Sequence, residues 1–278
     1  IVVNDVQPLI GYSPNSYTLT KGTAMSTASP TLYGTGQVVS WSVSPSLPLG
    51  ISLNTSTGDI SGTPTAITAS AVYTITATNS GGSDTTTVTI VVNDALPIIS
   101  YSQTSYTLTK DVAMTASSPT VNGGAVVTWS ISPSLPAGLT FETSNGTIWG
   151  TPTAITSSAS YTVFATNTGG TDTVALTIVV NDAAPTDLDY SPNTFTLTKG
   201  TQMTTVTPTA NGGTIVSFSV SPSLPAGLSL DTSTGAISGT PTAVTSSASY
   251  TITATNTGGT DTASVTIVVN DIAPSDLD

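Results

Sequence analysis

The sequence repeats itself three times at an almost constant interval. The string "TLTK" ends at Lys21, Lys110 and Lys199, so both intervals are 89 residues, and "SPSLP" recurs after 88 and then 89 residues. This period is too long for a solenoid unit of about 20 to 50 residues, and it fits a self-contained sandwich domain. Each repeat is therefore predicted to fold as a domain of its own.

The string "VVND" marks where one repeat ends and the next begins, because its four copies are separated by 89, 88 and 89 residues. Each linker that follows is short and contains Pro, which stiffens it and favours extended backbone before it. We expect the chain to be a window on a longer array. The predicted divisions are the last strand of a preceding repeat at 1–5, repeat 1 at 6–94, repeat 2 at 95–182, repeat 3 at 183–271, and the start of a following repeat at 272–278.

Within a repeat, short segments alternate apolar residues with Thr or Ser, which is typical of half-buried strands. Between them lie strings such as "NGG", "DTSTG" and "NTGGT", which supply the Gly, Asn or Asp that tight turns need. Seven short strands without a helical period predict an all-β fold, a β-sandwich, in each repeat. In repeat 3 the predicted strands are 194–199, 205–210, 215–220, 228–230, 236–239, 250–255 and 263–269.

Large aromatic residues fall into two groups by the alternation. The third strand carries Trp41, Trp129 and Phe218 at equivalent positions, where an aromatic side chain is predicted to fill the core. In repeat 2, Trp149 and Phe164 replace Ser and Thr at outward positions. We predict that these two lie on opposite sheets and are candidates for surface contact.

The composition excludes several classes of protein. Only 6% of the residues are charged, the formal net charge is -12, and the chain has no Arg, His or Cys. Such a chain repels nucleic acid, and none of its apolar runs approaches the ~20 residues of a membrane-spanning helix. Without imidazole or thiol, the commonest general base and transition-metal ligands are missing. We predict that the chain is not an enzyme and requires no cofactor.

Two strings connect the sequence to a known family. "SLPAGLSLDTSTGAISGTPT" (223–242) and "YTITATNTGGTDTASVTIVVND" (250–271) resemble the immunoglobulin-like repeats of bacterial and archaeal surface proteins, which are related to cadherin-like domains. The resemblance extends over all three repeats. It implies tandem immunoglobulin-like, seven-stranded Greek-key β-sandwiches, and it implies roles as spacers in adhesins or as modules beside secreted enzymes.

Each repeat has a single Lys, with the core-facing parity of its strand. In a sandwich of this type the first and last strands run parallel and adjacent, so this Lys is predicted to meet the Asp that ends the repeat. One interpretation is a partly buried ion pair that joins the two strands. Another is an amide crosslink, which needs a nearby carboxyl to transfer protons. The predicted pairs are Lys21 with Asp94, Lys110 with Asp182, and Lys199 with Asp271.

A third interpretation of the acidic residues is calcium bound between repeats, because Ca²⁺ takes several oxygen ligands and the domain ends are acidic. The hairpin acids Asp84, Asp172 and Asp261 are expected at the amino-terminal end of each repeat, facing the preceding linker. A Lys at the end of the first strand counts against calcium, since its charge replaces a cation. The candidate ligands are Asp94, Asp172, Asp182, Asp187, Asp189, Asp261 and Asp271.

These features lead to a functional hypothesis. The chain is predicted to be a structural spacer in the stalk of a large extracellular microbial surface protein, an adhesin, whose nearest partners are neighbouring repeats of the same chain. One alternative is a self-assembling extracellular filament, in which identical chains pack laterally or exchange terminal strands. A further alternative is a carbohydrate-binding accessory module of a secreted enzyme, which predicts clustered aromatic residues in every repeat.

Overall fold

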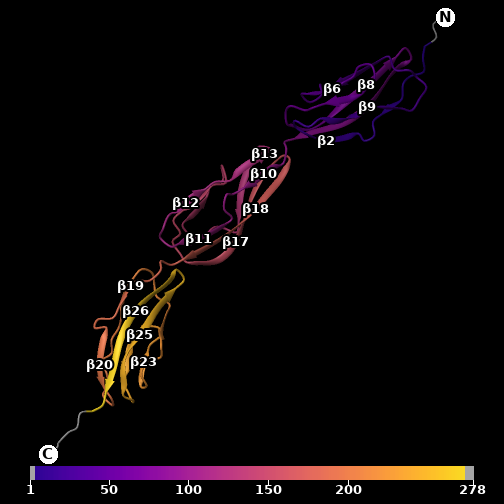
Figure 1. The fold of residues 1–278 in the computed structure, drawn as a ribbon. Helices are drawn as coiled ribbons and strands as arrows, with labels where there is room; N and C mark the ends of the chain where they lie inside the picture. The colour runs from indigo at the N-terminus through magenta and orange to yellow at the C-terminus, as the bar shows by residue number, and fades with distance from the viewer. Residues whose placement is uncertain (1–3, 273–278) are drawn as a thin grey trace, which may run out of the picture.

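The computed structural model describes residues 4–272, which form three β-sandwiches arranged end to end (Figure 1). The chain enters the array at one extremity and leaves at the other, and each sandwich occupies its own stretch of sequence. Residues 4–272 contain no α-helix, and therefore no helix that could cross a membrane. The predicted all-β class and its division into tandem sandwiches are confirmed.

Repeats 1 and 2 are built from the same nine strands, and repeat 3 has eight of them. In repeat 1 they are β1 (Ile10–Gly11), β2 (Ser16–Thr20), β3 (Met25–Ala28), β4 (Thr31–Leu32), β5 (Ser40–Ser44), β6 (Ile51–Leu53), β7 (Ile60–Gly62), β8 (Thr68–Asn79) and β9 (Gly82–Asn93). In repeat 2 they are β10 (Pro97–Ser100), β11 (Ser105–Thr109), β12 (Met114–Ser117), β13 (Thr120–Gly123), β14 (Thr128–Ser132), β15 (Leu139–Phe141), β16 (Ile148–Gly150), β17 (Thr156–Asn167) and β18 (Gly170–Asn181). In repeat 3 they are β19 (Thr186–Asp189), β20 (Thr194–Thr198), β21 (Thr209–Asn211), β22 (Ser217–Ser221), β23 (Leu228–Leu230), β24 (Ile237–Gly239), β25 (Thr245–Asn256) and β26 (Gly259–Asn270).

Two sheets face each other in every repeat. One has four strands, in the order β2-β9-β8-β5 in repeat 1, and the same order recurs as β11-β18-β17-β14 and β20-β26-β25-β22. The opposite sheet has the order β3-β7-β6 in repeat 1 and β12-β16-β15 in repeat 2. In repeat 3 it is reduced to β23-β24 and a bridge between Val206 and Ile237. A short separate pair, β1 with β4 or its equivalent, completes each sandwich.

The first and last strands run parallel, as predicted. β2 pairs with β9 in register from Ser16 opposite Thr89 to Thr20 opposite Asn93, and the same pairing joins β11 to β18 and β20 to β26. Because the two strands are parallel, the chain enters a repeat at one end and leaves it at the other. This topology arranges the repeats in series.

The longest element of each repeat is the antiparallel pair β8–β9, β17–β18 or β25–β26, which we call the long hairpin. Both strands have twelve residues, so the predicted ranges 250–255 and 263–269 were too short. Ile75 and Ile90 point into the core and are fully buried, while Thr74, Thr76 and their equivalents face outward. The hairpin continues past the last core residue, Ala77, to Asn79, which is also buried, and its outward Thr residues pair across strands without needing burial.

The structure corrects the sequence-based strand assignment in two further places. The predicted strand 205–210 is wrong, since only Val206 makes a bridge and β21 covers Thr209–Asn211. The short strands β1, β10 and β19, which precede the predicted first strand, were missed. They lie in the linker region, where Pro residues interrupt the alternation that marks a strand.

The predicted core aromatics are confirmed. Trp41, Trp129 and Phe218 are buried, and each lies over a glycine in the hairpin of the opposite sheet. In repeat 1 that glycine is Gly58, whose φ is +80° and whose hypothetical Cβ would lie 2.6 Å from the Trp41 ring. The site therefore excludes a side chain both by backbone conformation and by space.

Two glycines of repeat 1 allow these two effects to be separated. Gly22 also has a φ of +80°, but nothing lies within 4 Å of its hypothetical Cβ. We expect Gly22→Ala to cost about 1 to 2 kcal/mol through backbone conformation alone. Gly58→Ala should cost a further ~1 to 3 kcal/mol, because the methyl group overpacks the Trp41 pocket. The measurement is urea unfolding followed by Trp41 fluorescence in a Trp129→Phe, Trp149→Phe background, and equal losses for the two variants would contradict this account.

Candidate functional site: the junctions between repeats

The segment that leads into each repeat runs along the tip of that repeat's long hairpin. We call it the leading segment, and it comprises residues 4–12, 94–101 and 182–190. In repeat 2 the tip residue Thr168 accepts a hydrogen bond on Oγ1 from the Asp94 amide, at 2.9 Å. Asn93, one residue earlier, is still part of β9 in repeat 1. The chain is thus bound by the second repeat directly after it leaves the sheet of the first.

The same contact occurs at the other junction. The Asp182 amide donates to Thr257 Oγ1 of repeat 3 at 2.8 Å, again one residue after the last strand of repeat 2. The Asp182 carboxylate also accepts from the Thr214 amide of repeat 3 at 3.0 Å. Since these bonds hold the chain that leaves one repeat directly against the next repeat, both junctions have little free chain in which to bend.

A buried Asn at the end of β8, β17 and β25 holds the leading segment from the inside. Asn167 donates through Nδ2 to the carbonyl oxygens of Ala95, at 2.7 Å, and Ala125, at 3.2 Å. Its Oδ1 accepts from the Gly169 amide at 2.7 Å. Asn79 and Asn256 occupy the equivalent positions, and all three are buried. One amide side chain thus satisfies backbone groups in three different segments.

The hairpin acids lie where the sequence placed them, at the amino-terminal end of each repeat against the leading segment. Asp84 accepts on Oδ2 from the Ile10 amide at 2.8 Å. Asp172 accepts from the Ile99 amide at 2.7 Å, and Asp261 accepts from the Leu188 amide at 2.8 Å. Their carboxylates therefore serve as partners for backbone amides of the leading segment.

A buried tyrosine ends each leading segment. Tyr190 donates its hydroxyl to the Gly235 carbonyl at 2.5 Å, and Tyr12 and Tyr101 make the equivalent bonds to Gly58 and Gly146. Burial raises the pKa of Tyr190 to about 12 and raises the pKa of Tyr12 and Tyr101 as well. Because burial disfavours the charged phenolate, the neutral, donating hydroxyl is the favoured form.

Glycine is required at the hairpin tip because the leading segment passes so close to it. A Cβ on Gly169 would lie 2.3 Å from the Asp94 carbonyl oxygen, and a Cβ on Gly258 would lie 2.1 Å from that of Asp182. Both distances are far below contact distance, so any side chain at the tip would push the two repeats apart.

The three predicted ion pairs are not formed. Within residues 4–272 the one salt bridge joins Lys110 Nζ to Asp111 Oδ2 at 2.5 Å, and this pair raises the pKa of Lys110. The strand register is as predicted, since Lys21, Lys110 and Lys199 donate backbone amides to the last strand. The Asp carboxylates instead turn toward the following amide, as in the 3.0 Å bonds to Asp94, Asp182 and Asp271. The predicted amide crosslinks between these Lys and Asp residues therefore have no close pair to act on, since the one close Lys–Asp pair is Lys110 with its neighbour Asp111.

Each lysine is followed by a hydrogen-bonded turn. The Thr23 amide donates to the Thr20 carbonyl at 3.0 Å, and equivalent bonds at 3.2 and 3.1 Å close the turns after Lys110 and Lys199. Lys110 and Asp182 both line a cleft of ≈ 700 Å³ between repeats 2 and 3, and Asp182 contributes a further, smaller attraction that raises the pKa of Lys110.

The candidate calcium ligands are not gathered into a site. Among the residues that the structure describes, no group of three or more acidic side chains is placed to hold a metal ion. The carboxylates of Asp172, Asp182 and Asp261 accept from backbone amides instead. Asp187 accepts from Asn211 at 3.1 Å, and Asp189 is exposed on β19. The carboxylates of Asp172, Asp182 and Asp261, which were predicted to bind calcium, are thus hydrogen-bonded to backbone amides.

Trp149 and Phe164 lie on different sheets, as predicted. Trp149 is 46% exposed on β16, and Phe164 is partly buried at an outward position of β17. Phe164 has Ser130 and Thr173 as cross-strand neighbours, so it stands in a hydroxyl-bearing face. The two side chains do not form a common platform.

A comparison with protein families identifies the family of the three repeats. The family described as "Putative Ig domain" matches residues 7–93, 95–181 and 184–270. The chain belongs to this family. Its three Ig domains match nearly the whole length, which agrees with the predicted resemblance to immunoglobulin-like repeats of surface proteins.

Curated relatives of the Ig-domain chain are bacterial. It is 36% identical over 132 residues to the "Serine-rich adhesin for platelets" of Staphylococcus aureus strain MRSA252, and equally to that of strain MSSA476. The alignment covers 46% of this chain but only 9% and 6% of the two adhesins. The chain therefore matches a small part of a much larger surface protein.

The matching solved structures include tandem Ig and cadherin domains. The titin fragment I67–I69 gives a TM-score of 0.40 at 15% identity, covering 98% of both chains. The eight amino-terminal Ig domains of Down Syndrome Cell Adhesion Molecule give 0.44 at 13% identity, covering 97% of this chain and 36% of that one. Drosophila N-cadherin EC1-4 gives 0.32 at 13%, with 97% and 76% covered.

The buried Asn can be tested in repeat 1, where Asn79 donates to the Val6 and Gln37 carbonyls. Asn79→Asp removes both donors and places a negative charge against two carbonyl oxygens, so repeat 1 should lose roughly 3 kcal/mol or more. Asn54→Asp is the matched control, because Asp231 makes the equivalent turn hydrogen bonds in repeat 3. Asn54→Asp changes the net charge by the same amount as Asn79→Asp, and it should lower the unfolding free energy of repeat 1 by less than about 0.5 kcal/mol. Urea unfolding in the single-Trp background measures both, and similar losses would rule out a specific role for Asn79.

The buried hydroxyl of Tyr12 predicts that repeat 1 loses stability at alkaline pH. Because burial raises the pKa of Tyr12 above its ordinary value of 10.0, its contribution is complete below pH 10 and is lost as the pH rises further. Tyr12→Phe should lower the stability of repeat 1 at neutral pH by about 1 kcal/mol, through loss of one hydrogen bond. Above pH 10 the variant should show a shallower decline than the parent. Parallel profiles of unfolding free energy against pH would contradict the assignment.

Proposed function

We propose that this chain is a non-catalytic structural spacer, part of the stalk of a large extracellular microbial adhesin at the cell surface. The observation that carries the proposal is the junction, where each repeat binds the backbone that leaves the preceding one through Thr168 or Thr257. A spacer needs resistance to bending at its junctions more than it needs a binding pocket. The matches to Staphylococcus aureus platelet adhesins support the setting.

The path of the chain through each repeat also suits a spacer. Force along the chain reaches β2 and β9 at opposite ends of the repeat, because these strands are parallel. Their hydrogen bonds lie across the direction of pull and are stretched together rather than one at a time. Repeats 2 and 3 have the same five-residue pairing, so each sandwich resists extension in the same way.

The length of the rod follows from its strands. The twelve residues of each long-hairpin strand, at about 3.3 Å per residue, give ~40 Å per repeat and ~120 Å for three in series. The net charge of -12 opposes collapse of one repeat onto another. Solubility is supplied by the Thr and Ser of the outer faces rather than by charge.

Small-angle X-ray scattering tests this proposal on the intact chain. We expect a rod of about three domain lengths, unchanged by calcium or by a chelator, because backbone amides rather than a cation hold the junctions. Removing the two junction hydroxyls with Thr168→Val and Thr257→Val should reduce the radius of gyration. The control is Thr166→Val with Thr255→Val, on the outer sheet face. Equal changes in the radius of gyration for the two pairs of variants would refute the single-stalk proposal. A particle much wider than one sandwich would also refute it, and would favour the filament.

A further inference from the structure

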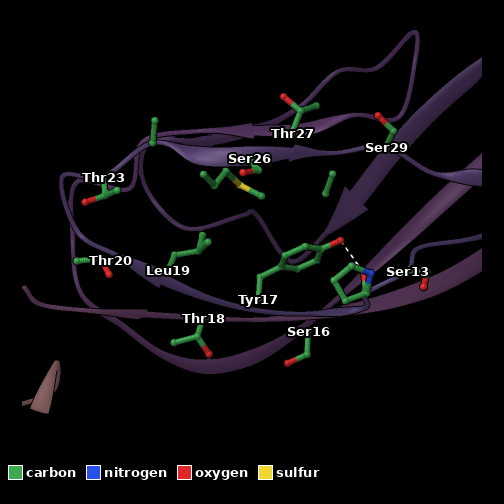
Figure 2. Close-up of a pocket in the computed structure, with 14 residues that line it drawn as sticks. Ser13, Ser16, Tyr17, Thr18, Leu19, Thr20, Thr23, Ser26, Thr27 and Ser29 are labelled. Carbon is green, nitrogen blue, oxygen red and sulfur yellow. Dashed lines mark hydrogen bonds between the residues drawn. The ribbon is translucent and has the colours of Figure 1, made fainter.

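Each repeat has a groove at the same place, on the side where the two sheets are open. In repeat 1 it is ≈ 580 Å³ and lies between β2 and β3. Figure 2 shows Tyr17 and Leu19 pointing from β2 toward the strand that carries Ser26 and Thr27, while Thr18 and Ser16 point away. The equivalent grooves in repeats 2 and 3 are ≈ 320 and ≈ 480 Å³.

The lining of the grooves combines Ser and Thr hydroxyls with a few large apolar side chains, and these apolar side chains are adaptable. The chain contains three methionines, and one lines each groove: Met25, Met114 and Met203. An aromatic residue and a leucine accompany each Met, as Tyr17 and Leu19 do in repeat 1. Met side chains adjust their shape to a partner more easily than branched residues do, which is why they are common at binding surfaces.

Unpaired strand edges border the groove. Within residues 4–272, β9 is the only strand paired with β2, and β7 is the only one paired with β3. The odd-numbered residues Asn15 and Lys21 hydrogen-bond to β9. The alternate residues Ser16 and Thr18 therefore direct their backbone amides and carbonyls toward the free side. Such an edge can bind one further extended strand.

No charged side chain lines any of the three grooves, although the chain has a net charge of -12. The field of the whole chain therefore attracts a basic ligand and repels an acidic one, including a second copy of this chain. Apolar side chains at every second position of a bound strand would face Tyr17, Leu19 and Met25.

We propose that the grooves of repeats 1 and 3 bind an extended peptide segment of a partner protein, alternating apolar and basic residues, as an added strand along the free edge of the first sheet strand, which is β2 in repeat 1. The same site exists along β20 in repeat 3, where Lys199 and Thr266 make the equivalent bonds between the first and last strands. This binding role is separate from the stalk role, since the grooves lie away from the junction contacts.

Repeat 2 is closed by a hydrogen bond across its groove. Tyr106 of β11 contacts Ser117 Oγ of β12 at 2.7 Å, while its hydroxyl donates to the Gln103 carbonyl at 2.8 Å. The position of Ser117 is taken by Ala28 in repeat 1 and Val206 in repeat 3, which have no hydroxyl. The bridge agrees with the smaller groove of repeat 2, and it predicts that repeats 1 and 3 bind peptide while repeat 2 does not.

The methionines provide one reporter for each groove. We would label the methionine methyl groups of the full chain with carbon-13, assign them by single Met→Leu variants, and titrate a peptide of about ten alternating Val and Lys residues. We expect the Met25 and Met203 resonances to shift and the Met114 resonance to stay. Ser117→Ala should allow Met114 to respond, and Ala28→Ser should weaken binding at Met25 by roughly tenfold, or about 1.4 kcal/mol.

Two further peptides and one dilution series decide the outcome. An alternating Ser and Lys peptide has the charge without the apolar anchors, and equal shifts with it would overturn the proposal. An alternating Val and Glu peptide should cause no shift. Absence of any shift with the Val and Lys peptide would also overturn it, as would methionine shifts that depend on protein concentration alone, because these would identify a second copy as the occupant. Scattering tests the stalk independently of all these results.

Discussion

The leading segment of each repeat contains backbone amides and carbonyls that no sheet neighbour satisfies, and the shape of the array depends on how they are satisfied. Asn167, Thr168 and Asp172 supply the partners in repeat 2, all from one hairpin tip. Because buried backbone groups without partners are costly, this arrangement strongly favours one position of the segment. The position of the segment in turn sets where the end of the preceding repeat lies.

This arrangement explains why the hairpins are long and their tips small. The strands β17 and β18 continue past the core so that Asn167 reaches the carbonyl of Ala95. Gly169 lets the backbone of the preceding chain lie directly against the tip. The outward Thr and Ser of these strands need no apolar cover, so the extension exposes little hydrophobic surface.

Much of the sandwich could be predicted from the sequence, because the signals are local. The alternation of Ile252 and Ala254 with Thr fixes strand faces, and the 89-residue spacing fixes the domain count. The parallel placement of Lys199 beside the last strand also followed, from the resemblance to immunoglobulin-like repeats. These features depend on periodicity, which a single sequence displays directly.

The junction could not be predicted in the same way. The string "NTGG" indicated a turn, but the burial of Asn167 depends on a segment 72 residues earlier in the chain. The ion-pair prediction had the right backbone register and the wrong side-chain geometry. A long Lys side chain in water gains little from a fixed pairing and loses conformational entropy, whereas a short Asp finds an amide one residue away.

The turns at the three lysines have a consequence for proteolysis. A trypsin-like protease cleaves only after Lys or Arg, and this chain offers it Lys21, Lys110 and Lys199. Cleavage needs several residues to enter the protease in extended form, which the hydrogen-bonded turn at each lysine opposes. A chain with so few basic residues, all of them in tight turns, is therefore a poor substrate for trypsin-like proteases.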